Sequence, residues 1–306
     1  MNGRHFTAAA LAGALFFLAA IGTAAAQPRL ERLADGVYGF VARGGRTNSA
    51  FIVTGEGVVV VDTQGPRELA LLLGEEIART TDEPVIYVIN THYHGDHTFG
   101  NQYFVQAREI IAHTDTRRLL IERDEAHRRR FVRFFGAESL EGFELTLPTM
   151  TMDSELVLRP GGREIVVRAA PGAHTDGDIY VYLPEEKVVI AGDLLYSRRL
   201  PWLGDGHTGR WLEVLEELEA LDADVYLPGH GEPTGVDGVR SFAAYLRELR
   251  AEVSRLMDEG KTLEEVKASI ELPRYAGYEK YEQWLPLNAA KVYGELKEQR
   301  RGRTGK

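Results

Sequence analysis

Short apolar runs alternate with amphipathic stretches along the chain. Three runs rich in β-branched residues, at 36–42, 49–54 and 57–63, are separated by glycine and asparagine, a pattern typical of strands joined by turns. Residues 58–61 are apolar without alternation, which indicates a strand buried on both faces. Residues 65–80 carry a proline near their start and space their leucines along one helical face, so they predict a helix.

The same alternation continues to the middle of the chain. Strands are predicted at 84–90 and 110–113, and one long charged helix at 114–135. The basic residues of this helix are expected to form a solvated face rather than a site for an anionic partner. Its three phenylalanines are expected to point inward: Phe131, Phe134 and Phe135.

The second half repeats the order of strands followed by helices. Strands are predicted at 155–159, 163–169, 179–184, 187–193 and 224–232. Helices are predicted at 209–223, 238–260, 262–270 and 278–299. No linker rich in glycine or serine divides the chain. Two similar halves of this kind predict an α/β protein in which two sheets pack face to face with helices outside.

The first 26 residues predict a signal peptide. A short positive start, an apolar stretch and small residues at Ala24 and Ala26 precede a cleavage point before Gln27. A retained membrane anchor is the alternative, but the apolar run is shorter than the ~20 residues that a spanning helix needs. We therefore expect a periplasmic or secreted bacterial protein that has no membrane association after cleavage.

Composition narrows the partners and the chemistry. The formal charge of −10 argues against nucleic acid, because that binding depends on Lys and Arg neutralising phosphates, but it says little about small substrates. A small-molecule substrate is the expected partner. The chain has no cysteine, so it has no disulfide, and a metal ion must be held by His, Asp or Glu. Such ligands suit zinc or iron. The oligomeric state stays open.

The segment THYHGDHTFGN, residues 91–101, places three of the nine histidines of the chain within six positions. In an extended segment His92 and His94 point to the same side and can grip one ion. Gly95 allows a sharp turn, after which Asp96 and His97 can aim at a second point nearby. The cluster follows a predicted strand, and sites in α/β folds are built at such ends. This density of ligands predicts a metal site.

Three more potential ligands lie in the second half, each at a predicted strand end and beside a glycine. They are His174 in PGAHTDGD, Asp193 in IAGD and His230 in LPGHGE. Each motif alone is weak, because a buried aspartate or a histidine in a turn is common. Their combination with the earlier cluster strengthens the prediction of a metal site.

The order His92, His94, Asp96, His97, His174, Asp193 and His230 resembles the metallo-β-lactamase superfamily. The resemblance implies an αβ/βα sandwich of four layers over residues 27–259, followed by a C-terminal helical extension at 260–306. It implies a first metal held by His92, His94 and His174. It implies a second metal held by Asp96, His97 and His230, with Asp193 as the carboxylate that bridges both metals in branches related to glyoxalase II.

The resemblance also implies a function. We expect two Zn²⁺ per chain, with iron as the alternative, and a metal-bound hydroxide that hydrolyses an ester, thioester or lactone carbonyl. Asp96 is expected to be the catalytic residue that both ligates and orients this hydroxide. A β-lactamase that cleaves an amide ring and a mononuclear iron dioxygenase of sulfur compounds are the two alternatives. Against a β-lactamase of the commonest branch, the cysteine and the lysine that this branch uses are replaced by Asp193 and Tyr196.

Several other residues are candidates for supporting roles. Asp62, Asp176 and Asp178 can accept the second N–H of a ligating histidine, although simple turn or cap roles are equally open. Arg198 and Arg199 can clamp an anion, but a solvated loop is the preferred interpretation. Side chains that can line a pocket follow: Tyr196, Trp202 and His207. The aromatic tail at 273–288 can cap the pocket entrance or form a dimer contact.

Overall fold

The structure is a computed structural model that describes residues 28–42 and 46–304. The predicted signal peptide, residues 1–26, lies outside the described residues. In the described ranges, no helix combines the length and the apolar character that crossing a bilayer requires.

The first half of the chain forms a seven-stranded mixed sheet in the order β1 to β7. Its strands are β1 (Arg29–Ala34), β2 (Val37–Val41), β3 (Ser49–Val53), β4 (Val58–Val61), β5 (Val85–Ile89), β6 (Glu109–His113) and β7 (Met150–Met152). Strands β1 to β4 pair antiparallel, and β4 to β7 pair parallel. Strands β1 and β7 were not predicted, because they are edge strands whose sequences contain no continuous apolar run.

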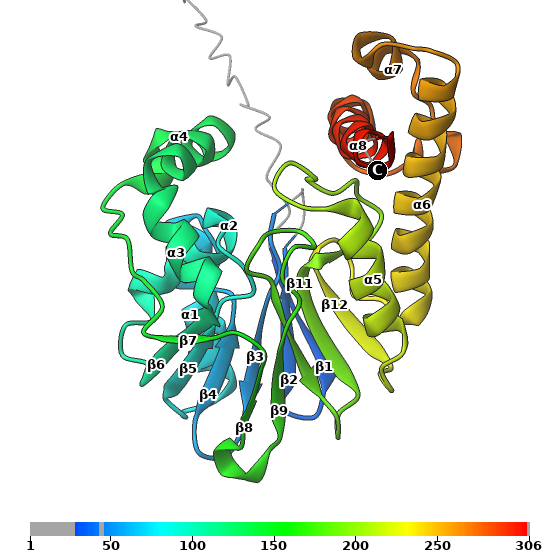
Figure 1. The fold of residues 1–306 in the computed structure, drawn as a ribbon. Helices are drawn as coiled ribbons and strands as arrows, with labels where there is room; N and C mark the ends of the chain where they lie inside the picture. Colours follow the sequence, from blue (N-terminus) through cyan, green and yellow to red (C-terminus); the bar gives the residue numbers. More distant parts are fainter. Residues whose placement is uncertain (1–27, 43–45, 305–306) are drawn as a thin grey trace, which may run out of the picture.

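The second half forms a five-stranded sheet in the order β12-β11-β10-β9-β8. Its strands are β8 (Glu155–Leu158), β9 (Ile165–Ala169), β10 (Ile179–Leu183), β11 (Val188–Tyr196) and β12 (Val225–His230). Strands β11 and β12 pair parallel, and the other pairs are antiparallel. The predicted αβ/βα sandwich is confirmed. The two sheets pack face to face, and helices cover both outer faces (Figure 1).

The strand β4 shows why the apolar run at 58–61 has no alternation. Val59 and Val61 pack in the core between the two sheets, together with residues such as Ile190 of the second sheet. Val58 and Val60 point the other way and pack in the core under helix α1 (Arg67–Thr80). Both faces of the strand are therefore buried, as predicted.

The helices of the first half are α1 (Arg67–Thr80), α2 (Gly95–Thr98), α3 (Thr114–Glu122) and α4 (Asp124–Phe135). The prediction of one helix at 114–135 was wrong, because the backbone at Arg123 leaves helical geometry with φ −109° and ψ 6°. Helix α4 therefore starts in a new direction and lies above the sheets (Figure 1). Phe131 is buried as predicted, but Phe134 is 54% exposed.

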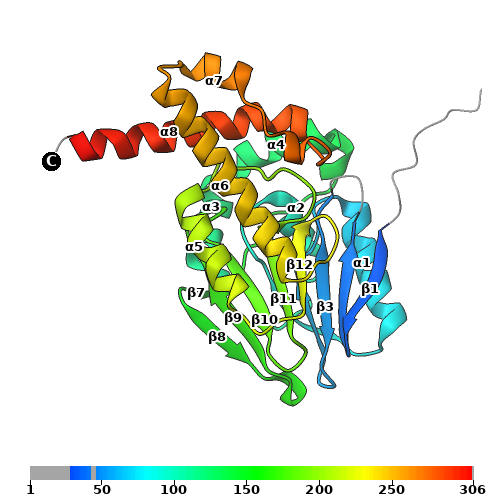
Figure 2. The same ribbon diagram turned by 90° about the vertical axis from the view of Figure 1, so that its right-hand side faces the viewer.

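The helices of the second half are α5 (Thr208–Glu219), α6 (Val236–Asp258), α7 (Leu263–Ser269) and α8 (Tyr281–Thr304). Helices α5 and α6 cover the outer face of the second sheet, and α8 crosses α6 above it (Figure 2). Trp211 of α5 and Trp284 of α8 belong to the same hydrophobic core. The predicted boundary at residue 260 stays a prediction, although the C-terminal helices pack directly on the preceding part of the chain.

Candidate metal centre

The histidine-rich segment does not continue strand β5 in an extended form. The chain bends through residues 91–93, and α2 begins at Gly95, so Asp96 and His97 lie on a short helix. Gly95 is needed for space rather than for a turn, because a Cβ there would lie 2.6 Å from the ring of Phe99. The expectation that the cluster aims at two points is correct, but a helical turn separates the two directions.

The three later residues reach the same place from the second sheet. His174 lies in the loop between β9 and β10, and His230 is the last residue of β12. Asp193 lies inside β11, which continues to Tyr196, so the predicted strand end at 193 was wrong. The pairing of β11 with β12 is irregular on both sides of Gly192, beside the aspartate.

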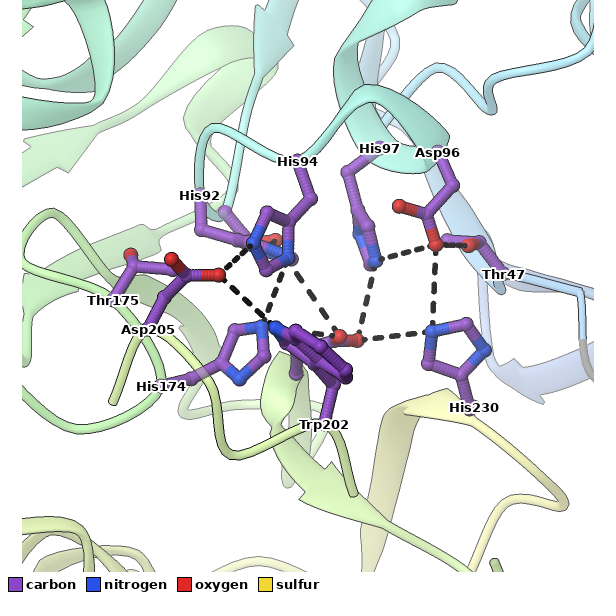
Figure 3. Close-up of polar contacts among 12 residues, drawn as sticks. Thr47, His92, His94, Asp96, His97, His174, Thr175, Trp202, Asp205 and His230 are labelled. Atoms are coloured by element: carbon purple, nitrogen blue, oxygen red, sulfur yellow. Dashed lines mark hydrogen bonds and ion pairs between the residues drawn. The ribbon is translucent and has the colours of Figure 1, made fainter. Parts of the chain in front are cut away.

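These side chains form two adjacent groups, as Figure 3 shows for the labelled residues. The first group contains His92, His94, His174 and Asp193, and the second contains Asp96, His97 and His230. In each group, one potential ligand atom from every residue lies within 4.8 Å of the others. All seven residues predicted from the sequence are therefore brought together, and the arrangement is consistent with a binuclear metal site.

The carboxylate of Asp193 lies between the two groups. Its Oδ2 is 3.3 Å from His174 Nε2, while its Oδ1 is 3.2 Å from His97 Nε2 and 3.5 Å from His230 Nε2. A Cβ at position 229 would lie 2.0 Å from Oδ1, so only the glycine there lets strand β12 approach this closely. One oxygen facing each group is the geometry of a bridging ligand.

Several polar atoms at the centre are buried and make no hydrogen bond. Within the described residues, His92 Nε2, His97 Nε2 and Asp193 Oδ1 have no hydrogen bond. His94 Nδ1 and His174 Nε2 face each other at 3.1 Å. Buried polar atoms are normally satisfied, so a cluster of unpaired lone pairs fits a site that binds cations. The donor set of imidazoles and carboxylates fits zinc or iron.

The three histidines of the first group are in the neutral form. Burial lowers the pKa of His92 well below its ordinary value, that of His94 to about 3 and that of His174 to about 4. A neutral imidazole has a free lone pair, which is the form that binds a metal ion.

In the second group, the neighbouring carboxylates favour the protonated form of a histidine. Burial disfavours a proton on His97, but the carboxylates of Asp193, Asp62 and Asp96 outweigh it and raise the pKa of His97 well above its ordinary value. Burial also disfavours a charged Asp193, yet His230 and His97 hold the pKa of this carboxyl well below its ordinary value. The carboxylates that favour a proton here would equally favour a metal cation in its place.

Of the three predicted supporting aspartates, Asp62 has the expected role. Its Oδ2 is 2.7 Å from His97 Nδ1, and Thr91 donates to both of its oxygens, so the imidazole presents Nε2 to the centre. Asp178 accepts the backbone N–H of His174 at 2.7 Å and therefore positions the loop rather than the ring. Asp176 is exposed, which favours the simple turn role over support of a ligating histidine.

Replacing Asp62 by asparagine is expected to weaken metal binding about 10- to 100-fold, because the amide cannot hold His97 in the same tautomer and orientation. Competition with a chromophoric chelator measures this affinity. Asp176→Asn, at an exposed position, is the matched control and should bind metal as the unchanged protein does. Equal affinities for both variants would contradict the role of Asp62.

Two supporting residues were missed in the sequence. Asp205 Oδ2 is 3.1 Å from His94 Nε2 and 3.0 Å from Trp202 Nε1, and Arg123 donates to Oδ1 at 2.9 Å. Burial favours the neutral acid, but hydrogen bonds from His94 and Trp202 and the charge of Arg130 hold the pKa of Asp205 far below its ordinary value. The hydroxyl of Thr47 donates to Asp96 Oδ2 at 2.6 Å. Neither residue has a spacing that connects it to the histidines, so no sequence signal identifies it.

A cavity of about 190 Å³ opens above the two groups of candidate metal ligands. Tyr196 and Trp202 line it, as the sequence suggested, and Tyr196 donates its hydroxyl to Asp193 Oδ2 at 2.5 Å. His207 does not line it; its side chain is 65% exposed before helix α5. Besides Gly95 and residues of the two ligand groups, the lining comes from helix α4, the loop after β11, and the segment at the start of α8.

Comparison with known proteins agrees with this geometry. A family model described as "Metallo-beta-lactamase superfamily" matches residues 42–230. The chain is 25% identical to a linear primary-alkylsulfatase of Pseudomonas sp. (strain ATCC 19151) over 271 residues, covering 74% of this chain and 50% of that protein. It is 24% identical to a metallo-beta-lactamase type 2 of Elizabethkingia meningoseptica over 218 residues, covering 68% of this chain and 80% of that protein.

Solved structures show the same fold. A sec-alkylsulfatase of Pseudomonas sp. superposes with a TM-score of 0.70 at 22% identity, over 88% of this chain and 50% of that one. A metallo-beta-lactamase from Pontibacter korlensis superposes with a TM-score of 0.60 at 20% identity, over 72% of this chain and 99% of that one. The chain thus spans about half the length of the alkylsulfatases that it matches. Because the family model covers more than half of the chain and both metal groups lie at its sheet edge, the protein belongs to the metallo-beta-lactamase superfamily.

Proposed function

We propose that the protein is a hydrolase that uses two metal ions to cleave an ester, thioester or lactone carbonyl. The observation that carries this proposal is the position of Asp193, which directs one carboxylate oxygen to each of two buried groups. The second group, Asp96, His97 and His230, is complete, and this favours a binuclear hydrolase over a mononuclear iron dioxygenase.

Metal ions bound here supply a nucleophile at neutral pH, because coordination lowers the pKa of water to about 7, and they polarise the bond to be cleaved. One ion would be held by His92, His94 and His174. The other would be held by Asp96, His97 and His230, and Asp193 would contact both. Asp96 is the proposed catalytic residue. Thr47 donates to its Oδ2, which leaves Oδ1 to accept a hydrogen bond from the attacking water and orient it.

We propose zinc as the metal, since two ions with imidazole and carboxylate ligands and an open position suit zinc hydrolysis. An exported protein acting on a small molecule remains our proposal for location and partner. Aromatic rings of α4 and α8 line part of the cavity, which supports a substrate with an apolar part.

Two other substrates have specific support. A sulfate ester is supported by the similarity to alkylsulfatases and by the cations that line the cavity: Arg130, Arg199 and Lys280. A β-lactam amide is supported by the match to 80% of the Elizabethkingia enzyme. The chain has no cysteine, so its site differs from the commonest β-lactamase branch, where a cysteine occupies the position of Asp193.

Metal analysis and a substrate panel test the proposal together. We expect two zinc ions per chain, loss of activity on chelation, and recovery when Zn²⁺ is returned. The panel contains a chromogenic cephalosporin, a glutathione thioester, a 4-nitrophenyl ester and hexyl sulfate. Cleavage of the cephalosporin alone, abolished in His94→Ala, would establish the β-lactamase instead. One iron per chain would contradict binuclear zinc hydrolysis.

A further inference from the structure

One wall of the cavity comes from the C-terminal helices. Lys280 and Trp284 line it together with Arg199 of the loop that follows β11. Figure 1 shows α8 above the ends of the second sheet, on the side of the centre opposite to α4. Lys280 and Trp284 lie beyond the family match, which ends at residue 230, whereas Arg199 lies inside it. The wall therefore joins a loop of the family fold to the C-terminal segment.

Arg199 is buried, and few groups of the protein balance its positive charge. It is only 6% exposed, and its Nη1 donates to Glu279 Oε2 at 3.1 Å. The side chain of Glu279 is 58% exposed, so water screens much of its charge. Arg199 Nε has no hydrogen-bond partner in the part of the chain that the structure describes. A buried guanidinium usually has more partners than this, which indicates that a further anion belongs beside it.

The backbone around Arg199 is built to hold it in place. Leu200 N–H donates to the carbonyl of Glu279, and Glu279 N–H donates to the carbonyl of Arg198, both at 3.0 Å. Arg198 and Lys280 flank this junction with positive φ angles of 52° and 65°. Residues other than glycine rarely adopt this conformation, and strain of this kind gathers at binding sites.

The position of Arg199 connects it to both the metal centre and the aromatic rings. Its guanidinium lies 5.0 Å from the ring centre of Trp284, and Arg199 lines the same cavity as Tyr196 and His230. Across the cavity, Arg130 lies 5.2 Å above the ring of Trp202. A ligand in this space therefore meets cations beside flat apolar surfaces, close to the second metal group.

We propose that Arg199 and Lys280 form a subsite for an oxyanion of the substrate, a carboxylate or a sulfate, whose apolar part lies against Trp202 and Trp284. The subsite deepens the proposed function, since it names an organic anion as the substrate class, and it rests on that function. Arg199 can offer a charge-assisted hydrogen bond, and Lys280 can add a second charge.

A matched pair of esters tests the subsite. The mono-4-nitrophenyl ester of adipic acid carries a terminal carboxylate, and 4-nitrophenyl hexanoate has the same number of acyl carbons without it. We expect Arg199→Met to raise KM for the charged ester about 10- to 100-fold, the cost of one charge-assisted hydrogen bond, and to leave the neutral ester nearly unchanged. Arg199→Lys should recover part of the loss.

Arg240→Met is the control, because the side chain of Arg240 is 55% exposed and pairs with Asp237 on helix α6, outside the cavity lining. It should leave both esters unchanged. Metal content and melting temperature of each variant show whether the centre and the fold are intact. Equal loss on both esters in an intact Arg199→Met variant, or no preference for the charged ester in the unchanged protein, would overturn the subsite.

Binding without turnover separates the subsite from the proposed reaction. Calorimetry with naphthalene-2-sulfonate and its neutral methyl sulfone should show tighter binding of the anion, and a loss of about tenfold or more in Arg199→Met. If no ester is cleaved but this difference is found, the hydrolase proposal fails and the subsite stands. Equal binding of the sulfonate to both proteins, or no binding to either, would overturn the subsite.

Discussion

Asp193→Asn is expected to lower hydrolysis about 10³-fold or more and to reduce the metal content below two ions per chain. The carboxylate faces both groups, and a neutral amide removes its negative charge and one of its two ligating oxygens. Metal coordination contributes several kcal/mol to transition-state stabilisation, and each ~1.4 kcal/mol corresponds to a tenfold change in rate. The amide keeps nearly the same size, so the close approach of strand β12 is preserved.

Elemental analysis and steady-state kinetics on the same preparation check this expectation. Asp222→Asn is the matched control, because the side chain of Asp222 is 78% exposed and pairs with Lys187 away from the centre. It should retain both metals and full activity. An Asp193→Asn variant with two metal ions and unchanged turnover would show that this carboxylate does not join the two groups.

Trp211→Ala is expected to lower the free energy of unfolding by about 3–5 kcal/mol. Trp211 is fully buried in the core under α5 and α6, and its indole N–H donates to the carbonyl of Leu194 at 2.9 Å. Alanine would leave a cavity and an unsatisfied buried carbonyl. The ring also lies 5.2 Å from that of His174, so the loss of packing should weaken metal binding as well.

Urea unfolding followed by circular dichroism measures the stability change. Trp202→Ala provides the comparison, because Trp202 is partly exposed in the cavity wall and its removal creates no closed void. Its effect on unfolding should be clearly smaller. If both variants were destabilised equally, burial in this core would not be the source of the effect.

The seven candidate ligands were predictable because each lies in a short motif whose meaning is local. A strand run followed by glycine and a histidine or aspartate predicts a strand end, which is correct at His230, while β11 continues past Asp193 to Tyr196. The strands of both packed sheets nevertheless bring these residues to one edge. The apolar run 58–61 was equally informative, since burial on both faces leaves no polar position to alternate. The family resemblance then connected the motifs in order.

The wrong predictions share a cause. The helical pattern at 114–135 is continuous, yet the chain breaks at Arg123, whose guanidinium reaches Tyr93 and Asp205. Phe134 has the spacing of a core residue, but α4 lies above an open cavity, where its ring is exposed. At Arg123, contacts with distant parts of the chain outweigh the local pattern, and at Phe134 the position of α4 leaves the ring without a covering surface.

The sequence by itself therefore determined the two-sheet architecture, the set of candidate ligands and the family, because hydrophobic period and ligand motifs act over a few residues. Only the tertiary structure decided which oxygen of Asp193 faces which group, that Asp205 and Thr47 support the ligands, and that Arg199 is buried rather than solvated. Those facts depend on side chains from distant elements meeting in space, and no spacing along the chain encodes such a meeting.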